Sequence, residues 1–301
     1  MMLSLKPAVF AIILAIGPSW ATAGEVRSDQ RTASAALGRE IAYTIYLPDG
    51  YSEPNARFPV IYVLHGFGAG QREWFHGGRL KETLDRLIEA EEIRPVIAVA
   101  PAAGKSWYVD SADYGGPGDY ETAIVHDLVM AIDRHYPTIA DRAHRAIAGI
   151  SMGGHGALRF AFAHPDRFSA VAALSPGIWK PGGVSWSLSP QFDPPEEREK
   201  WFPRTTGETF DLATFNAQSP FALVANVATY EFPPRILIAV GNDDYWSLQD
   251  GALEMYLDLR AHGLKPMLRV ADGDHSWKFW RPIVDHVLRF LNDGWPNPEN
   301  G

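Results

Sequence analysis

The hydrophobic pattern alternates short, continuously apolar segments with longer segments of helical periodicity. Residues 59–64 (PVIYVL) and 96–100 (VIAVA) are apolar throughout, as expected of strands buried on both faces. Residues 80–92 place their leucines on one side of a helix. Further strands are predicted over 41–47, 146–149, 168–174, 235–240 and 266–271, and further helices over 120–135, 153–163, 248–262 and 277–291. This alternation predicts a mostly parallel sheet with helices on both faces.

One long segment departs from the alternation. Residues 176–218 are rich in proline and glycine and contain the charged run 196–200. A long irregular insertion in a compact domain is usually a lid, a binding loop or a disordered segment. Because it has no sustained periodicity, we do not expect a second domain. The prediction is one domain over residues 24–301 with an irregular insertion at about 176–218.

The first 23 residues have the pattern of a secretory signal peptide. Lys6 supplies the positive charge, residues 7–17 are apolar, and Ala21-Thr22-Ala23 gives the small-x-small cleavage pattern. The alternative is a membrane anchor, but a spanning helix needs about 20 apolar residues. We therefore expect cleavage near Ala23, export to the periplasm or the medium, and no membrane anchor.

Charge and cysteine content exclude several classes of function. The chain has 27 Lys and Arg against 36 Asp and Glu, for a net charge of −9. Nucleic acids and anionic membrane surfaces bind basic patches, so neither is expected as a partner. The absence of cysteine excludes disulfides, cysteine-ligated metal sites and a thiol nucleophile.

The sequence Gly149-Ile150-Ser151-Met152-Gly153 fits the G-x-S-x-G pattern of a serine nucleophile. A predicted strand precedes it and a predicted helix follows it, which is the strand–turn–helix context that this pattern requires. The two glycines suit a tight turn in which side chains would collide. Ser151 is therefore the candidate nucleophile.

A serine hydroxyl needs an adjacent base, and in this type of site the chain order is serine, acid, histidine. Asp243 and Asp244 both follow the predicted strand 235–240, and the residues alone leave the choice between them open. His275 follows the next predicted strand, whereas the other two histidines beyond the acid lie at a helix end or within a helix. His275 is the candidate base.

An ester-cleaving site also needs two backbone N–H groups that face the developing oxyanion. Met152, the residue after the nucleophile, supplies one. The glycine-rich segment 65–70 (HGFGAG) after an early strand suits the other, with His65 in a structural role. No phosphate-binding motif is present. Asp272 and Asp274 beside His275 are also common turn residues, so neither a metal nor another cofactor is expected.

Several segments resemble the putative-esterase family of α/β-hydrolases, which includes S-formylglutathione hydrolases, antigen 85-type mycolyltransferases and feruloyl esterases. The matching segments cover about residues 38–292 and include YLPDGY at 46–51, VLHGF at 63–67, AGISMGGHGA at 148–157, GNDD at 241–244 and GDHSW at 273–277. The resemblance implies an α/β-hydrolase fold without a cofactor. It also implies Asp244 as the acid and the Phe67 N–H as the second oxyanion donor. S-formylglutathione hydrolases are usually cytosolic, so the signal peptide argues against that activity.

These features together predict an exported serine esterase that acts through an acyl-enzyme on a small-molecule or glycan-linked ester. One alternative is an acyltransferase, in which a sugar or another alcohol replaces water in the second step. A more remote alternative is a non-catalytic binding protein on the same scaffold. The sequence does not predict the oligomeric state.

Tryptophan is unusually placed. Ten are present, and Trp20 lies in the signal segment. Eight of the remaining nine follow the carboxyl end of a predicted strand or lie in the insertion, with Trp295 as the exception. Ligands bind at that edge of open parallel sheets. We therefore predict an aromatic-rimmed cleft for a ring-bearing or sugar-bearing ester, with substrate contacts from Trp107, Trp179, Trp246 and Trp277.

Overall fold

The computed structural model describes residues 23–188, 193–244 and 247–296. The predicted signal segment, apart from Ala23, and the predicted substrate contact Trp246 therefore lie outside the described residues. The strands are β1 (Glu25–Ser34), β2 (Arg39–Leu47), β3 (Val60–Leu64), β4 (Ile97–Pro101), β5 (Arg145–Ile150), β6 (Ala170–Leu174), β7 (Arg235–Gly241) and β8 (Met267–Ala271).

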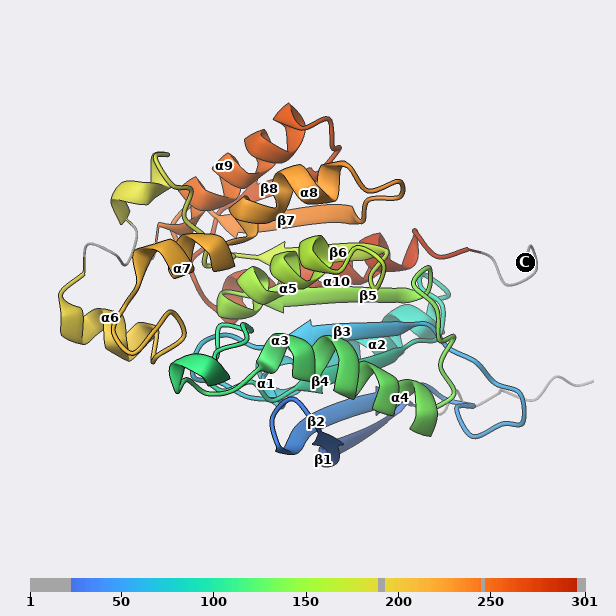
Figure 1. Cartoon of the computed structure of the whole chain (residues 1–301). Helices are drawn as coiled ribbons and strands as arrows, with labels where there is room; N and C mark the ends of the chain where they lie inside the picture. The colour runs from blue at the N-terminus through green and yellow to red at the C-terminus, as the bar shows by residue number, and fades with distance from the viewer. Residues whose placement is uncertain (1–22, 189–192, 245–246, 297–301) are drawn as a thin grey trace, which may run out of the picture.

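These strands form one eight-stranded sheet in the order β1-β2-β4-β3-β5-β6-β7-β8. The six strands from β4 to β8 along this order pair in parallel, while β2 pairs antiparallel with both β1 and β4. Figure 1 shows β3, β5, β6 and β7 side by side in the middle of the molecule. The prediction of a mostly parallel sheet is confirmed.

The first strand was not predicted from the sequence. β1 (EVRSDQRTAS) is polar, and most of its residues are exposed or half-buried. It is an edge strand that pairs only with β2, with a register shift between Arg27 and Gln30. Val26 packs against the core, but the rest of the strand is mostly polar. It therefore lacks the apolar alternation by which strands are recognised.

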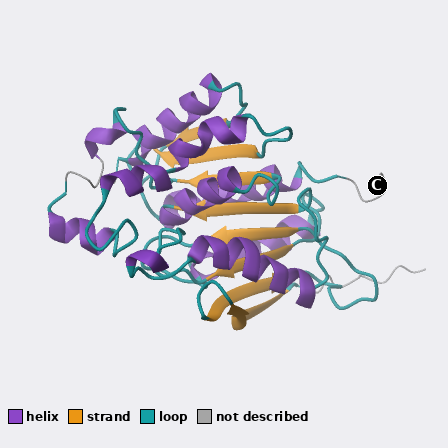
Figure 2. Ribbon diagram, viewed as in Figure 1, coloured by secondary structure: helices purple, strands orange, loops and turns teal. Residues whose placement is uncertain are grey.

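Helices cover both faces of the sheet (Figure 2). The helical elements are α1 (Glu73–His76), α2 (Leu80–Glu89), η1 (Ala112–Tyr114), α3 (Tyr120–Thr122), η2 (Ala123–Leu128), α4 (Val129–His135), α5 (Met152–Ala163), η3 (Ser185–Leu188), α6 (Pro195–Trp201), α7 (Leu212–Gln218), η5 (Pro220–Leu223), α8 (Val224–Ala228), α9 (Leu248–Ala261) and α10 (Trp277–Asn292). Within the described residues, no helix combines the length and apolar character needed to cross a membrane.

The core consists of two apolar layers, one on each face of the sheet. Along β3, Tyr62 contributes to the layer shared with α4, α5 and α9, whereas Ile61 and Val63 contribute to the layer shared with α2 and α10. Successive residues of a strand point to opposite faces. A strand covered on both faces is therefore apolar throughout, which explains why the central strands were predictable.

Two helical segments differ from the prediction. The predicted helix 120–135 is interrupted by a π-helical turn, η2, between α3 and α4. The insertion 176–218 is not irregular throughout, because it contains η3, α6 and α7. With seven residues each, α6 and α7 complete only about two turns, too few for a clear periodic pattern.

Candidate active site

Ser151 lies in the sharp turn between β5 and α5. Its backbone has φ 54° and ψ −118°, outside the regions that L-residues favour. A Cβ on Gly149 would lie 2.0 Å from the carbonyl oxygen of Gly153, and a Cβ on Gly153 would lie 2.3 Å from that of Leu64. Both glycines are therefore required for this turn, which lifts the Ser151 side chain out at the sheet edge.

The side chains of Ser151, His275 and Asp244 form one hydrogen-bonded chain. His275 Nε2 lies 3.0 Å from Ser151 Oγ, and His275 Nδ1 lies 2.8 Å from Asp244 Oδ2. The Asp244 side chain is fully buried, and that of His275 is 8% exposed. Asp243 is exposed, and its backbone N–H donates to Gly273 O. Of the two candidate acids, Asp244 is therefore the one that contacts His275.

The two predicted oxyanion donors come from the two segments that flank Ser151. Met152 is the first residue of α5, so its N–H is among those that lack an intrahelical partner. Phe67 follows β3 and lines the same cavity as Ser151. The two predicted donors thus belong to the loop after β3 and to the start of α5, the element that Ser151 precedes.

His65 occupies the structural position that the sequence predicts. Its imidazole is buried, and burial lowers its pKa to about 4. The ring is therefore neutral near pH 7. Its Nδ1 lies 2.8 Å from Gly66 O, and the Ala103 N–H donates to its Nε2 at 2.9 Å. Donation from Nδ1–H to Gly66 satisfies both ring nitrogens and joins the loop after β3 to the loop after β4.

A cavity of about 560 Å³ opens at Ser151 and His275. Much of its wall is aromatic, with rings from Phe67, Trp107, Trp179, Trp201, Phe202, Trp277 and Trp280. Trp107, Trp179 and Trp277, three of the predicted substrate contacts, thus lie beside the nucleophile. Trp74 and Trp295 instead lie in the apolar core that α2 and α10 share with the sheet.

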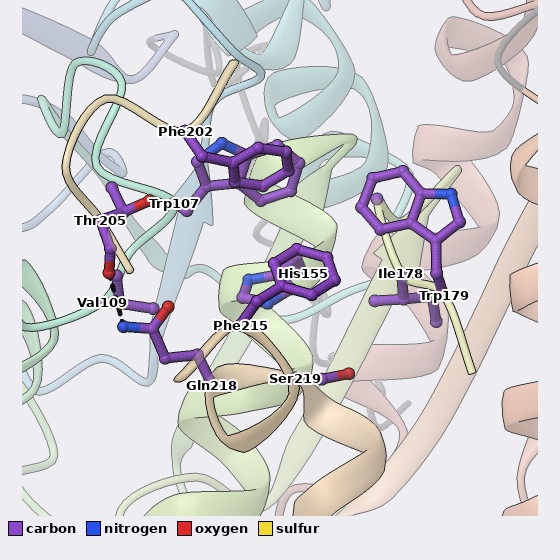
Figure 3. A pocket seen from close by; sticks show the side chains of 11 residues that line it. Trp107, Val109, His155, Ile178, Trp179, Phe202, Thr205, Phe215, Gln218 and Ser219 are labelled. Atoms are coloured by element: carbon purple, nitrogen blue, oxygen red, sulfur yellow. Dashed lines mark hydrogen bonds between the residues drawn. The ribbon is translucent and has the colours of Figure 1, made fainter. Parts of the chain in front are cut away.

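A second, smaller cavity of about 20 Å³ shares part of this aromatic wall, and Figure 3 shows the side chains that line it. Trp107, Trp179 and Phe202 border both cavities. Trp107 stacks on Phe202 with ring centroids 4.6 Å apart, and its indole N–H donates to the Trp201 carbonyl at 2.7 Å. The insertion and the loop after β4 therefore build this wall together.

Sequence reasoning missed Glu73, the first residue of α1, which also lines the large cavity. The Gly66 N–H donates to its Oε2 at 2.7 Å, and the Trp277 indole donates to the same carboxylate. Burial raises the pKa of the Glu73 carboxyl, although these two bonds and the nearby His275 oppose the shift. The sequence offers no motif for it, because the contact arises only when the loop folds back on itself.

Other polar groups near the site have structural partners. Glu121 is buried against Arg159 and His164, and neither it nor Tyr120 lines the large cavity. Asp272 accepts from Asn242 Nδ2, and Asp274 accepts from the neighbouring Ser276 hydroxyl. Within the ranges that the structure describes, no three His, Asp or Glu side chains converge as a metal-binding group.

A mostly parallel sheet with helices on both faces and a serine at a strand–helix turn defines the α/β-hydrolase fold. Residues 34–291 match the family described as Putative esterase. The chain belongs to this family.

Individual relatives agree with this assignment. The chain is 30% identical over 153 residues to an endo-1,4-beta-xylanase/feruloyl esterase of Xylanibacter ruminicola, covering 49% of this chain and 21% of that protein. It is 28% identical to the S-formylglutathione hydrolase of Paracoccus denitrificans, covering 88% of this chain and 92% of that one. A ferulic acid esterase structure has a TM-score of 0.73 at 27% identity, covering 91% and 99%. The chain spans about a fifth of the length of the first of these relatives.

Proposed function

We propose that the protein is an exported serine esterase that cleaves aromatic or sugar-linked esters. The observation that carries the proposal is the hydrogen-bonded chain Ser151–His275–Asp244, of which Ser151 and His275 line an aromatic cavity. A base within hydrogen-bond reach of a serine, itself oriented by a buried acid, is the arrangement that activates a hydroxyl nucleophile.

In the first step, Ser151 Oγ attacks the ester carbonyl carbon as its proton passes to His275 Nε2. Asp244 holds the imidazole in the required tautomer and stabilises the imidazolium. The carbonyl oxygen becomes an oxyanion, to which the N–H groups of Met152 and Phe67 donate. His275 then protonates the leaving alkoxide as the ester C–O bond breaks, which leaves an acyl group on Ser151.

The second step repeats this chemistry with water. Water attacks the acyl-enzyme carbonyl and gives a proton to His275, and the carboxylic acid leaves as Ser151 regains that proton. The cavity wall supports a ring-bearing substrate, since indole and phenyl faces stack on aromatic acyl groups and on sugar rings. The names of the feruloyl and ferulic acid esterases among the relatives favour hydroxycinnamoyl esters as the first substrates to test.

The proposal of export rests on the signal-peptide pattern and on the contacts that Gly24, the first residue after the predicted cleavage site, makes in the structure. Cleavage after Ala23 would leave β1, which begins at Glu25, complete. The Gly24 backbone nitrogen lies 2.9 Å from Asp85 Oδ1, so cleavage would place the new terminal ammonium beside a carboxylate. A Cβ on residue 24 would lie 2.4 Å from the Tyr46 ring, which suits glycine at this position.

The test measures hydrolysis of p-nitrophenyl esters of increasing acyl length, methyl ferulate and acetylated sugars by the wild type and Ser151→Ala. We expect ferulate or acetylated sugars to be preferred, and Ser151→Ala to lower kcat by at least about 10³-fold. Activity that survives in Ser151→Ala would refute the nucleophile. Transfer of the acyl group to an added alcohol in preference to water would replace hydrolysis by acyl transfer.

A further inference from the structure

We propose that Glu73 is a positioning residue that fixes the Gly66–Phe67 peptide, so that the Phe67 N–H is aimed at the oxyanion. The inference rests on the proposed esterase function. It assigns a role to a carboxylate that lies in the cavity and is not a member of the Ser151–His275–Asp244 chain.

Glu73 closes the loop after β3 with two different groups. Its side-chain Oε2 accepts the Gly66 N–H at 2.7 Å, and its backbone N–H donates to Gly70 O at 3.0 Å. Between these points the loop contains Gly68 in a left-handed conformation, with φ +74°. Glycine-rich backbone is costly to order, so two bonds from one residue restrict a segment that would otherwise be mobile.

The bonds to Gly66 determine the direction of the Phe67 N–H. The Gly66 carbonyl oxygen accepts from His65 Nδ1 at 2.8 Å and from the Ala69 N–H at 3.2 Å. In a planar trans peptide, the N–H of the next residue points opposite to this carbonyl. With the Gly66 N–H held by Glu73 and its carbonyl held by His65, both backbone torsions of Gly66 are restrained.

The environment of Glu73 favours an acceptor over an ion-pair role. Among the described residues, no Lys or Arg forms a salt bridge with its carboxylate, which accepts from Gly66 and Trp277 and lies near the His275 imidazole. A largely buried carboxylate that no Lys or Arg neutralises is costly to retain. Two donors, one from the loop after β3 and one from the start of α10, offset part of that cost. The proposal therefore rests on the reach of this side chain to the Gly66 N–H and not on its charge.

Two substitutions separate reach from charge. Glu73→Gln keeps the length and one acceptor oxygen but loses the charge, whereas Glu73→Asp keeps the charge but withdraws the carboxylate from Gly66. Exposed Glu82 on α2 provides matched controls, Glu82→Gln and Glu82→Asp. For each variant we would measure kcat, KM, Tm and the affinity of a boronic acid that forms a tetrahedral adduct with Ser151.

We expect Glu73→Asp to lower kcat by about 10-fold or more, with KM within about twofold and a parallel loss of boronic acid affinity, because an oxyanion donor acts mainly in the transition state. Glu73→Gln should stay within about fivefold of wild type. The inference is overturned if Gln is as impaired as Asp, if Asp matches wild type, or if the loss lies in KM alone. If the wild type itself has no activity that depends on Ser151, the proposed function fails instead.

Discussion

The indole of Trp280 packs edge-on against the imidazole of His275, with ring centroids 4.8 Å apart and ring planes at 81°. The same indole donates from Nε1 to Ser175 Oγ at 3.0 Å. Ser175 follows β6, and Trp280 belongs to α10. The candidate base is thus supported by a side chain that is itself bonded to a neighbouring strand end.

Trp280→Ala is expected to lower kcat by roughly 10- to 100-fold, because an imidazole displaced by about 1 Å no longer meets Ser151 correctly. Trp280→Phe keeps a ring beside His275, and Ser175→Ala removes only the hydrogen bond to the indole. Both should lose less activity than Trp280→Ala. Steady-state kinetics of the three variants on one ester tests this order of activities. An unchanged kcat in Trp280→Ala would contradict the role of Trp280 in holding His275.

Asp243 and Asp244 are adjacent, so substituting each in turn tests which of them is the acid that orients His275. Asp244→Asn should lower kcat by about 10⁴-fold, since the amide favours the wrong imidazole tautomer. Asp243→Asn should remain within a few-fold of wild type, because Asp243 is exposed and its backbone N–H is bonded to Gly273. A larger loss in Asp243→Asn than in Asp244→Asn would reverse the assignment.

Two buried histidines make the stability of the fold sensitive to mild acid. Burial lowers the pKa of His65 to about 4 and that of His155 to about 3, from 6.5. The unfolded chain therefore binds more protons than the folded chain below pH 6.5, and the free energy of unfolding falls as the pH falls from 6.5 towards 4.

Each histidine should contribute a slope of up to about 1.4 kcal/mol per pH unit in this window. Urea unfolding between pH 7.5 and 5 measures it, above the range in which most carboxylates titrate. His155→Gln should remove roughly half of the pH dependence attributed to the two residues. A free energy of unfolding that does not change over this pH range would contradict the prediction.

The contact between Gly24 and Asp85 predicts a gain in stability on processing. A free ammonium at Gly24 should stabilise the chain by about 1 kcal/mol over a chain that retains residues before it, as expected of an ion pair whose carboxylate is partly exposed. Asp85→Asn should remove this difference, whereas Glu82→Gln on the same helix should preserve it. The effect is measured as the difference in Tm between the chain that begins at Gly24 and the longer chain. If Glu82→Gln reduced this difference as much as Asp85→Asn, the ion pair would not be specific.

The central fold was predictable because its strands are covered on both faces and its helices are amphipathic. β1 and the short helices of the insertion were not, since an exposed edge strand and a helix of two turns carry no clear hydrophobic period. Ser151 and His275 could be named as candidates from the sequence because they follow strand ends in a fixed order. The residues alone left Asp243 and Asp244 equivalent; the family resemblance favoured Asp244, and the three-dimensional contact with His275 agrees with it.

Glu73 marks the limit of reading the site from the sequence. It is separated from Gly66 by seven positions within a glycine-rich loop, and no periodic or motif-based rule relates the two. The contact depends on how the loop closes, which is a property of backbone torsions. The same reasoning applies to Phe202, whose place in the cavity wall follows from how the insertion packs on Trp107.

The reacting groups and the cavity wall come from different parts of the fold. Ser151, His275 and Asp244 follow strands of the sheet, whereas Trp201 and Phe202 belong to the connection between β6 and β7. That connection can change in length and composition over evolution without disturbing the hydrogen-bonded chain. Descendants of one ancestral enzyme could therefore acquire new ester preferences by replacing a single loop, while the bond-breaking apparatus is inherited intact.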